Sequence, residues 1–134
     1  MNRPRIVITG LGGLCPIGTD AAAIWKAMQA GQSGIGPLET IPLHDLKIRS
    51  GGEIKELPAH DIDRKRLVTM DRFSLLAVLA AGQALSQAGL SAGAERTDRI
   101  GAVVGTGICG WEAIEESYRS VFLEGKTRAG IFTV

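Results

Sequence analysis

Two glycine-rich turns, each containing one of the chain's two cysteines, are the segments of this sequence best suited to chemistry. The first runs Gly10-Leu-Gly-Gly-Leu-Cys-Pro-Ile-Gly18 and the second runs Gly105-Thr-Gly-Ile-Cys-Gly110. Each turn follows a run rich in β-branched residues and precedes a segment with helical spacing. Glycine turns after buried strands lie where α/β proteins assemble their ligand sites. The sequence therefore predicts an α/β protein that contains two strand-turn-helix units.

The second turn has the spacing G-x-G-x-x-G, which is typical of a dinucleotide-binding fingerprint. Such a fingerprint also needs an acidic residue about 20 positions further on, at the end of the next strand. The candidate here, Glu124, follows a predicted helix instead, and the first unit lacks its second strand. A Rossmann nucleotide-binding module therefore fits the pattern only in part. The alternative is that the glycines permit a tight turn and close packing.

Cys15 and Cys109 are candidate nucleophiles, because a helix N-terminus lowers the pKa of a nearby thiol. Neither cysteine has an obvious histidine partner, since His44 and His60 both lie in a loop-rich segment. The histidines also show no metal-ligand spacing with the cysteines, so we expect no metal site. The alternative is that both cysteines are small buried residues. Two thiols do not make a disulfide framework, which indicates a reducing, cytoplasmic location.

The composition is ordinary for a soluble globular protein, with 45% hydrophobic and 22% charged residues. A net charge of +1 argues against binding nucleic acid with the whole surface. No apolar stretch approaches the roughly 20 residues that span a membrane. Glycines and Pro16 also interrupt the N-terminal apolar run too early for a signal peptide. We therefore expect neither nucleic acid nor a membrane as a partner.

The first unit is predicted to contain a strand over Arg5–Thr9 and then a helix. Thr19 is the predicted N-cap of this helix, and Gly31 is predicted to end it. Residues 32–62 show no sustained period and are predicted to be loop-rich, with a short strand near Ile48–Ile54.

The second unit is predicted to contain a strand over Arg99–Val104 that is apolar on both faces. That pattern favours a buried parallel sheet. An amphipathic helix over Trp111–Leu123 follows, and Gly125 ends it.

Between the two units, nearly every residue of Phe73–Ala88 is apolar, which predicts a helix covered on more than one side. Asp71 is a plausible cap for this helix, and Gly89 closes it. Two strands provide little sheet to cover so apolar a helix. We therefore expect residues 1–134 to be the front portion of a larger fold that does not fold alone.

A compact cationic run, Arg64-Lys-Arg66, precedes the central helix, and Lys126 and Arg128 occur later. These residues fit either an anion-docking patch or an ordinary solvated face.

Together these segments resemble the N-terminal part of a β-ketoacyl-[acyl-carrier-protein] synthase, synthase II in particular. The matching motifs occur in the same order along essentially the whole chain. They are Val7-Ile-Thr-Gly-Leu-Gly12, Trp25-Lys-Ala-Met-Gln-Ala-Gly-Gln-Ser-Gly-Ile35, Met70-Asp-Arg-Phe73, Arg99-Ile-Gly101 and Gly105-Thr-Gly-Ile-Cys-Gly110.

The resemblance implies a thiolase-like fold of α-β-α-β-α layers, of which residues 1–134 are the front part of the first half. It implies a homodimer that performs a decarboxylative Claisen condensation in fatty acid elongation. The substrates would be acyl and malonyl thioesters of acyl carrier protein, and no cofactor would be needed. The family's catalytic cysteine and two histidines would fall beyond Val134, so the residues given would be inactive alone.

The resemblance also assigns accessory roles. Ile108 matches the residue that gates the acyl-chain pocket, and Phe132 and Thr133 match a segment that lines the pocket of the dimer partner. Lys65 and Arg128, helped by Arg64 and Lys126, match the basic surface that docks the carrier protein.

Relatives often carry further cations at Val68 and Thr69, so docking here is expected to be weaker or differently placed. The alternatives are a non-catalytic homologue resembling a chain-length factor, and a polyketide or nodulation-type synthase.

Overall fold

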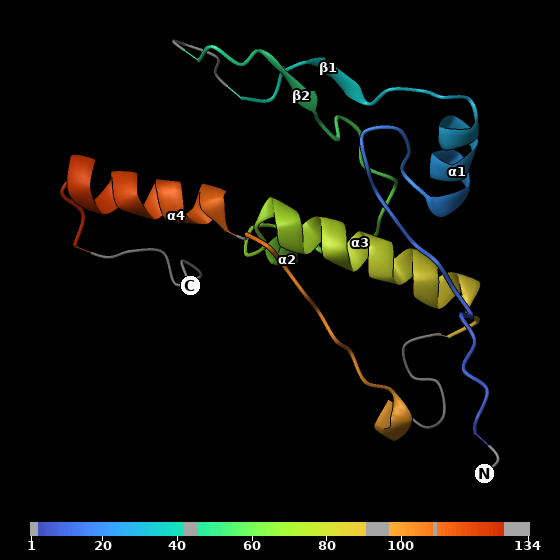
Figure 1. Ribbon diagram of the computed structural model, residues 1–134. Helices are drawn as coiled ribbons and strands as arrows, with labels where there is room; N and C mark the ends of the chain where they lie inside the picture. Colours follow the sequence, from blue (N-terminus) through green and yellow to red (C-terminus); the bar gives the residue numbers. More distant parts are fainter. Residues whose placement is uncertain (1–2, 42–45, 91–96, 109, 128–134) are drawn as a thin grey trace. The chain divides into compact units, whose positions relative to one another are not determined.

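The computed structural model describes residues 3–41, 46–90, 97–108 and 110–127 (Figure 1). The chain divides into two compact units. Unit 1 comprises Met1–His60 and Val78–Ala92, and unit 2 comprises Asp61–Ala77 and Gly93–Val134. Helix and strand are both present, as the sequence predicts.

In unit 1, helix α1 spans Ala21–Gln29 and ends before Gly31, whose φ of 65° only glycine adopts easily. The prediction that Thr19 is the N-cap of this helix is wrong. Asp20 takes that position in extended conformation, and its Oδ1 accepts a hydrogen bond from the amide of Ala23 at 2.8 Å. A carboxylate at this position also interacts favourably with the positive end of the helix dipole.

Strands β1 (Ile35–Pro37) and β2 (Ser50–Gly52) follow and pair antiparallel, with Gly36 opposite Gly51. β2 confirms the short strand predicted near Ile48–Ile54. β1 was not predicted, because Ile-Gly-Pro carries no alternating pattern.

The strands predicted over Arg5–Thr9 and Arg99–Val104 are wrong for this structure. Arg99 instead ends a 3₁₀ turn over Thr97–Arg99, and neither predicted segment joins a sheet in the described part of the chain (Figure 1). A strand exists only through hydrogen bonds to a neighbour, and none of the described residues pairs with either segment. Their side chains are correspondingly open, with Ile6 94% and Val103 102% exposed.

Helix α3 spans Arg72–Gln87, which confirms the predicted central helix, and Gly89 with φ 69° follows its end. Of its described residues only Leu79 is buried, while Phe73, Val78 and Leu85 are between 40% and 45% exposed. The described residues therefore leave much of this apolar helix uncovered.

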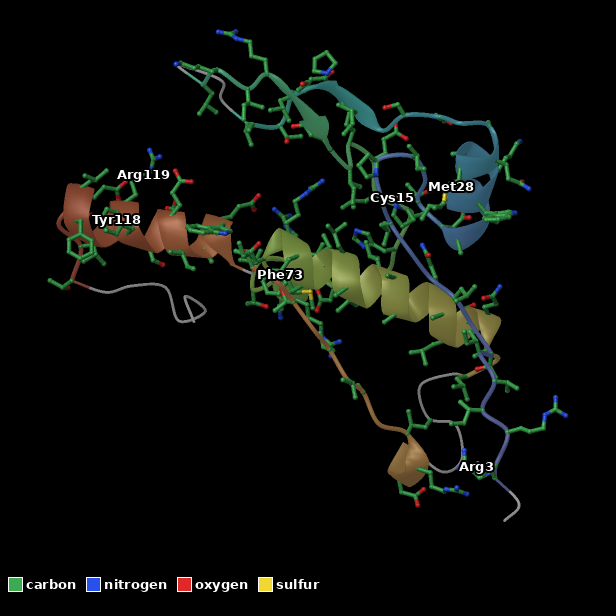
Figure 2. All side chains as sticks on the ribbon, in the orientation of Figure 1. Arg3, Cys15, Met28, Phe73, Tyr118 and Arg119 are labelled. Atoms are coloured by element: carbon green, nitrogen blue, oxygen red, sulfur yellow. The ribbon has the colours of Figure 1, made fainter. Side chains whose placement is uncertain are left out.

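In unit 2, helix α2 (Arg64–Leu67) is a single turn, and α4 spans Trp111–Tyr118. A π-helical segment, Arg119–Leu123, continues α4, so the predicted helix over Trp111–Leu123 is confirmed as a helical region with a wider last turn. Figure 2 shows Tyr118 projecting from the end of α4, where its ring stacks on Phe122 with centroids 4.6 Å apart. None of the described helices is both long enough and apolar enough to cross a bilayer.

Candidate functional site

The first glycine turn packs directly on the backbone of α3. A Cβ placed on Gly10 would lie 2.0 Å from the carbonyl oxygen of Ala84, and one on Gly12 would lie 1.9 Å from that of Ala80. The two alanines are four residues apart and share one face of the helix. Only glycine permits such an approach, so Gly10 and Gly12 serve close packing.

Two glutamines of α3 bind the backbone of the same turn. Gln87 Oε1 accepts from the amide of Leu11 at 2.6 Å, and Gln83 Oε1 accepts from the amide of Gly13 at 3.0 Å. Gln83 also donates through Nε2 to the carbonyl of Thr19 at 2.7 Å. The two amides are thus already satisfied and do not form a phosphate cradle.

Sequence reasoning missed this role of Gln83 and Gln87. The available signal was their spacing, because they are polar residues four apart in a mostly apolar helix.

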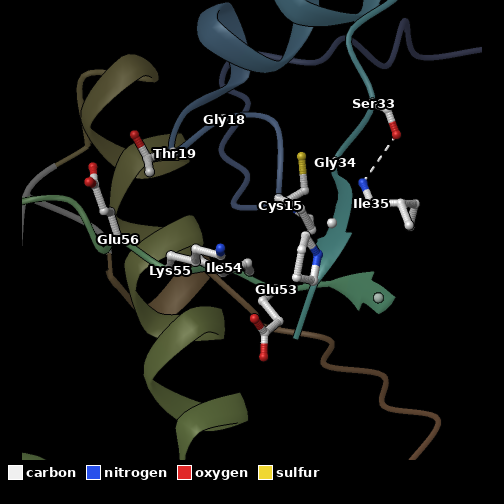
Figure 3. A pocket seen from close by; sticks show the side chains of 14 residues that line it. Cys15, Gly18, Thr19, Ser33, Gly34, Ile35, Glu53, Ile54, Lys55 and Glu56 are labelled. Atoms are coloured by element: carbon white, nitrogen blue, oxygen red, sulfur yellow. Dashed lines mark hydrogen bonds between the residues drawn. The ribbon is translucent and has the colours of Figure 1, made fainter. Parts of the chain in front are cut away.

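A pocket of about 350 Å³ lies between the end of this turn and the β1–β2 hairpin (Figure 3). Cys15 lines it and is half-buried, and its amide and carbonyl both pair with Gly18, at 2.9 and 3.1 Å. Figure 3 shows the Cys15 side chain beside Gly34.

Cys15 has no imidazole partner among the described residues, where His60 is an exposed loop residue as predicted. Cys109 and His44 lie outside those residues. Across the described ranges, no three His, Cys, Asp or Glu side chains are grouped to hold a metal. Within the described ranges, the pocket therefore offers a half-buried thiol without an imidazole to activate it.

Glu53, on the wall of this pocket, holds the hairpin together. Its carboxylate accepts hydrogen bonds from the amides of Glu39 and Thr40, at 2.8 and 2.9 Å, and from the Thr40 hydroxyl. The hydroxyl bond first, and then the two amides, lower the pKa of Glu53. Lys55 pairs with Glu39 alongside. The Glu53 carboxylate therefore has a structural role, because it links the two arms of the hairpin.

The lowered pKa of Glu53 predicts an acid-sensitive hairpin. A folded-state pKa below the ordinary 4.5 means that the ionised carboxylate stabilises the hairpin at pH values above 4.5. That stabilisation is lost as the pH falls through the lowered value. We expect Glu53→Gln to speed hydrogen exchange at the amides of Glu39 and Thr40 at neutral pH, measured by mass spectrometry. Glu56→Gln, at an exposed glutamate that also lines the pocket, is the control, and equal exchange in both variants would contradict the role of Glu53.

The second glycine turn leads into α4 without a side-chain cap of its own. Gly110 is the N-cap residue, with φ 70°. Asp71 supplies the missing acceptor, since its Oδ2 accepts from the amide of Ala113 at 3.2 Å. Asp71 directly precedes α3, in the position expected of its cap, and its backbone carbonyl accepts from the Leu75 amide at 3.1 Å.

A dinucleotide would place its pyrophosphate at the N-terminus of α4. The Asp71 carboxylate already occupies that end and would repel a phosphate. Glu124, the acidic candidate of the fingerprint, pairs with Lys126 at 2.8 Å after the helix. The Rossmann interpretation therefore has no support in the described geometry.

The residues that the resemblance assigns to the acyl pocket are described only in part. Ile108 lies in unit 2 with its side chain 71% exposed, and its carbonyl accepts from the Thr106 hydroxyl at 3.4 Å. Phe132 and Thr133 lie outside the described residues. Ile108 is therefore the one predicted pocket residue that falls within the described part of the chain.

Of the predicted docking cations, Arg64 and Lys65 are adjacent and exposed on α2. Asp63 caps this helix by accepting from the Lys65 amide at 3.1 Å, so its carboxylate is directed to the backbone. Neither Arg64 nor Lys65 forms an ion pair within the described part of the chain.

Lys126 differs from them. Its hydrogen bond and ion pair with Glu124 raise the pKa of Lys126 and lower that of Glu124, and they offset its charge locally. Arg128 lies outside the described residues.

Comparison with known proteins matches residues 3–131 to the β-ketoacyl synthase N-terminal domain. Nodulation protein E of Rhizobium sp. (strain N33) is 62% identical over 130 residues, which cover 97% of this chain and 32% of that protein. Nodulation protein E of Rhizobium leguminosarum bv. trifolii is 58% identical over 129 residues, or 96% of this chain and 32% of the relative.

The 3-oxoacyl-[acyl-carrier-protein] synthase 2 of Synechocystis sp. (strain ATCC 27184 / PCC 6803 / Kazusa) is 36% identical over 135 residues, covering all of this chain and 32% of that enzyme. The chain thus spans about a third of the length of these relatives. The resemblance of the ordered motifs is confirmed, and the chain belongs to the β-ketoacyl synthase family through its N-terminal domain.

Proposed function

We propose that this chain is the N-terminal portion of a nodulation-type β-ketoacyl synthase. The observation that carries this proposal is the identity of 62% to a nodulation protein E, against 36% to a synthase 2, over nearly the same residues. The family match supports a condensing, acyl-transferring enzyme.

In the proposed enzyme, an acyl chain passes from carrier protein to a cysteine thiolate and releases the carrier thiol. Malonyl-carrier protein then loses carbon dioxide, and the resulting carbanion attacks the cysteine thioester. This step forms a carbon–carbon bond, gives the 3-oxoacyl product on the carrier and frees the cysteine. The cysteine and two histidines that do this chemistry would lie in the remainder of the protein.

The same proposal gives the open apolar segments a role. Residues 5–9 and 99–104 would become strands of the layered thiolase-like fold once further strands pair with them. Their exposed side chains, Ile6 and Val103 among them, support this proposal because a soluble protein rarely leaves such runs open.

The accessory residues keep their proposed roles. Ile108 would gate the acyl pocket, and Phe132 and Thr133 would line the pocket of the partner in a homodimer. Arg64, Lys65, Lys126 and Arg128 would dock acyl carrier protein, whose acidic surface complements them. The enzyme would work in the cytoplasm without a cofactor.

The test is a condensation assay on the purified full-length protein with acyl- and malonyl-carrier protein. We expect a 3-oxoacyl product longer than the primer by the two carbons of a decarboxylated malonyl unit. The non-catalytic alternative predicts no product from this protein alone, and that result would overturn the proposal. The sequence after Val134 discriminates the same alternatives, since a condensing enzyme needs a cysteine among small residues at a helix start.

A further inference from the structure

Helix α4 takes its N-terminal cap from a distant part of the chain. Its own N-cap residue, Gly110, has no side chain, while the Asp71 carboxylate accepts from the Ala113 amide at 3.2 Å in a part-buried position. The two partners are 42 positions apart and belong to the same unit. Because the first amides of a helix lack intrahelical partners and carry partial positive charge, an ionised acceptor holds this end firmly.

Asp71 is itself held in place by the corner between α2 and α3. The Thr69 hydroxyl and amide both donate to the carbonyl of Arg66, at 2.8 and 3.0 Å. The Met70 amide donates to Leu67 at 3.2 Å, and the Asp71 carbonyl accepts from Leu75. The carboxylate that caps α4 thus projects from a hydrogen-bonded corner.

Among the described residues, few contacts fix the turn before α4. A Cβ on Gly105 or Gly107 would meet no atom within 4 Å, so neither glycine is pressed against a neighbour. The carbonyl of Ile108 accepts a local hydrogen bond from the Thr106 hydroxyl, at 3.4 Å. The position of this turn therefore depends on where α4 begins.

We infer that Asp71 is a positioning residue that fixes the start of α4, and with it the Ile108 turn, and thereby determines which acyl chains enter the pocket. The inference about acyl chains rests on the proposed function of Ile108. The inference about position rests on the hydrogen bonds of unit 2 alone.

The test uses the full-length protein and the variants Asp71→Ala and Asp71→Asn, with Asp61→Ala as a matched control at an exposed aspartate of the same unit. Condensation is measured with a short and a long acyl-carrier primer. We expect Asp71→Ala to change the ratio of the two kcat/KM values by about fivefold to tenfold. This fold-change corresponds to the free energy that is typically lost with an N-cap. Asp71→Asn, which keeps an oxygen acceptor, should restore most of the wild-type ratio.

An equal loss with both primers would show a merely structural role and overturn the inference about acyl chains. Hydrogen exchange over residues 110–115 provides a readout independent of activity. Asp71→Ala should raise it and Asp61→Ala should not, and unchanged exchange would overturn the positioning role. A wild-type protein that condenses neither primer would overturn the proposed function, while the exchange result would still decide the positioning role.

Discussion

Replacement of Gly12 by alanine is expected to destabilise the full-length protein by about 3 kcal/mol or more. The added Cβ would lie 1.9 Å from the carbonyl oxygen of Ala80 and 2.9 Å from Gln83 Cβ. Since the closest atom belongs to the helix backbone, no side-chain rotation relieves the clash. The turn would have to move away from α3 and would lose the Gln83 and Gln87 hydrogen bonds to its amides. Thermal and urea unfolding measure the loss.

Gly82→Ala is the matched control for this prediction. Gly82 lies in the same helix, but its added Cβ would meet no described atom within 4 Å. Alanine also favours a helix over glycine by about 1 kcal/mol, so this variant should lose much less stability than Gly12→Ala. If Gly12→Ala unfolded at the same urea concentration as Gly82→Ala, the packing of the first turn on α3 would be contradicted.

The helices could be predicted from the sequence because the signals that define them are local. The apolar run of the central helix lies within consecutive residues, and Gly31, Gly89 and Gly125 take the positive φ that follows a helix end. The N-cap of α1 was assigned one residue too early because Thr19 and Asp20 are adjacent and both suit that position.

The strands could not be predicted with the same success. β-structure depends on a partner that the local pattern does not specify, and the described residues supply none to Arg5–Thr9 or Arg99–Val104. The family could still be identified, because the motifs occur in the order typical of the family whether or not the sheet forms.

The candidate site shows the same difference between features set by local sequence and features set by distant contacts. The cations of α2 were evident as a run of charge, but the pairing of Lys126 with Glu124 depends on side-chain geometry. The cap that Asp71 gives to α4 and the two glutamines that bind the first turn are contacts between distant residues. The spacing of the glutamines places them on one helix face, but it does not specify the distant residues that they contact.

Charge reversal at Lys65 is expected to raise the KM for acyl carrier protein by about tenfold with little change in kcat. Lys65 is exposed on α2 and has no ion pair among the described residues, so its full charge is available to an acidic partner. Attraction between exposed charges is screened by salt, so the difference between Lys65→Glu and the wild type should shrink as ionic strength rises. Steady-state kinetics of the full-length enzyme at two salt concentrations measure both effects.

Lys126→Glu and Lys47→Glu complete the comparison, because each makes the same change of charge at another exposed lysine. Lys126 already pairs with Glu124, so its reversal should raise the KM less than that of Lys65. Lys47 belongs to unit 1, outside the proposed docking surface, and its reversal should leave the KM unchanged. An equal rise in all three variants would reflect net charge alone, and an unchanged KM for Lys65→Glu would remove α2 from the docking surface.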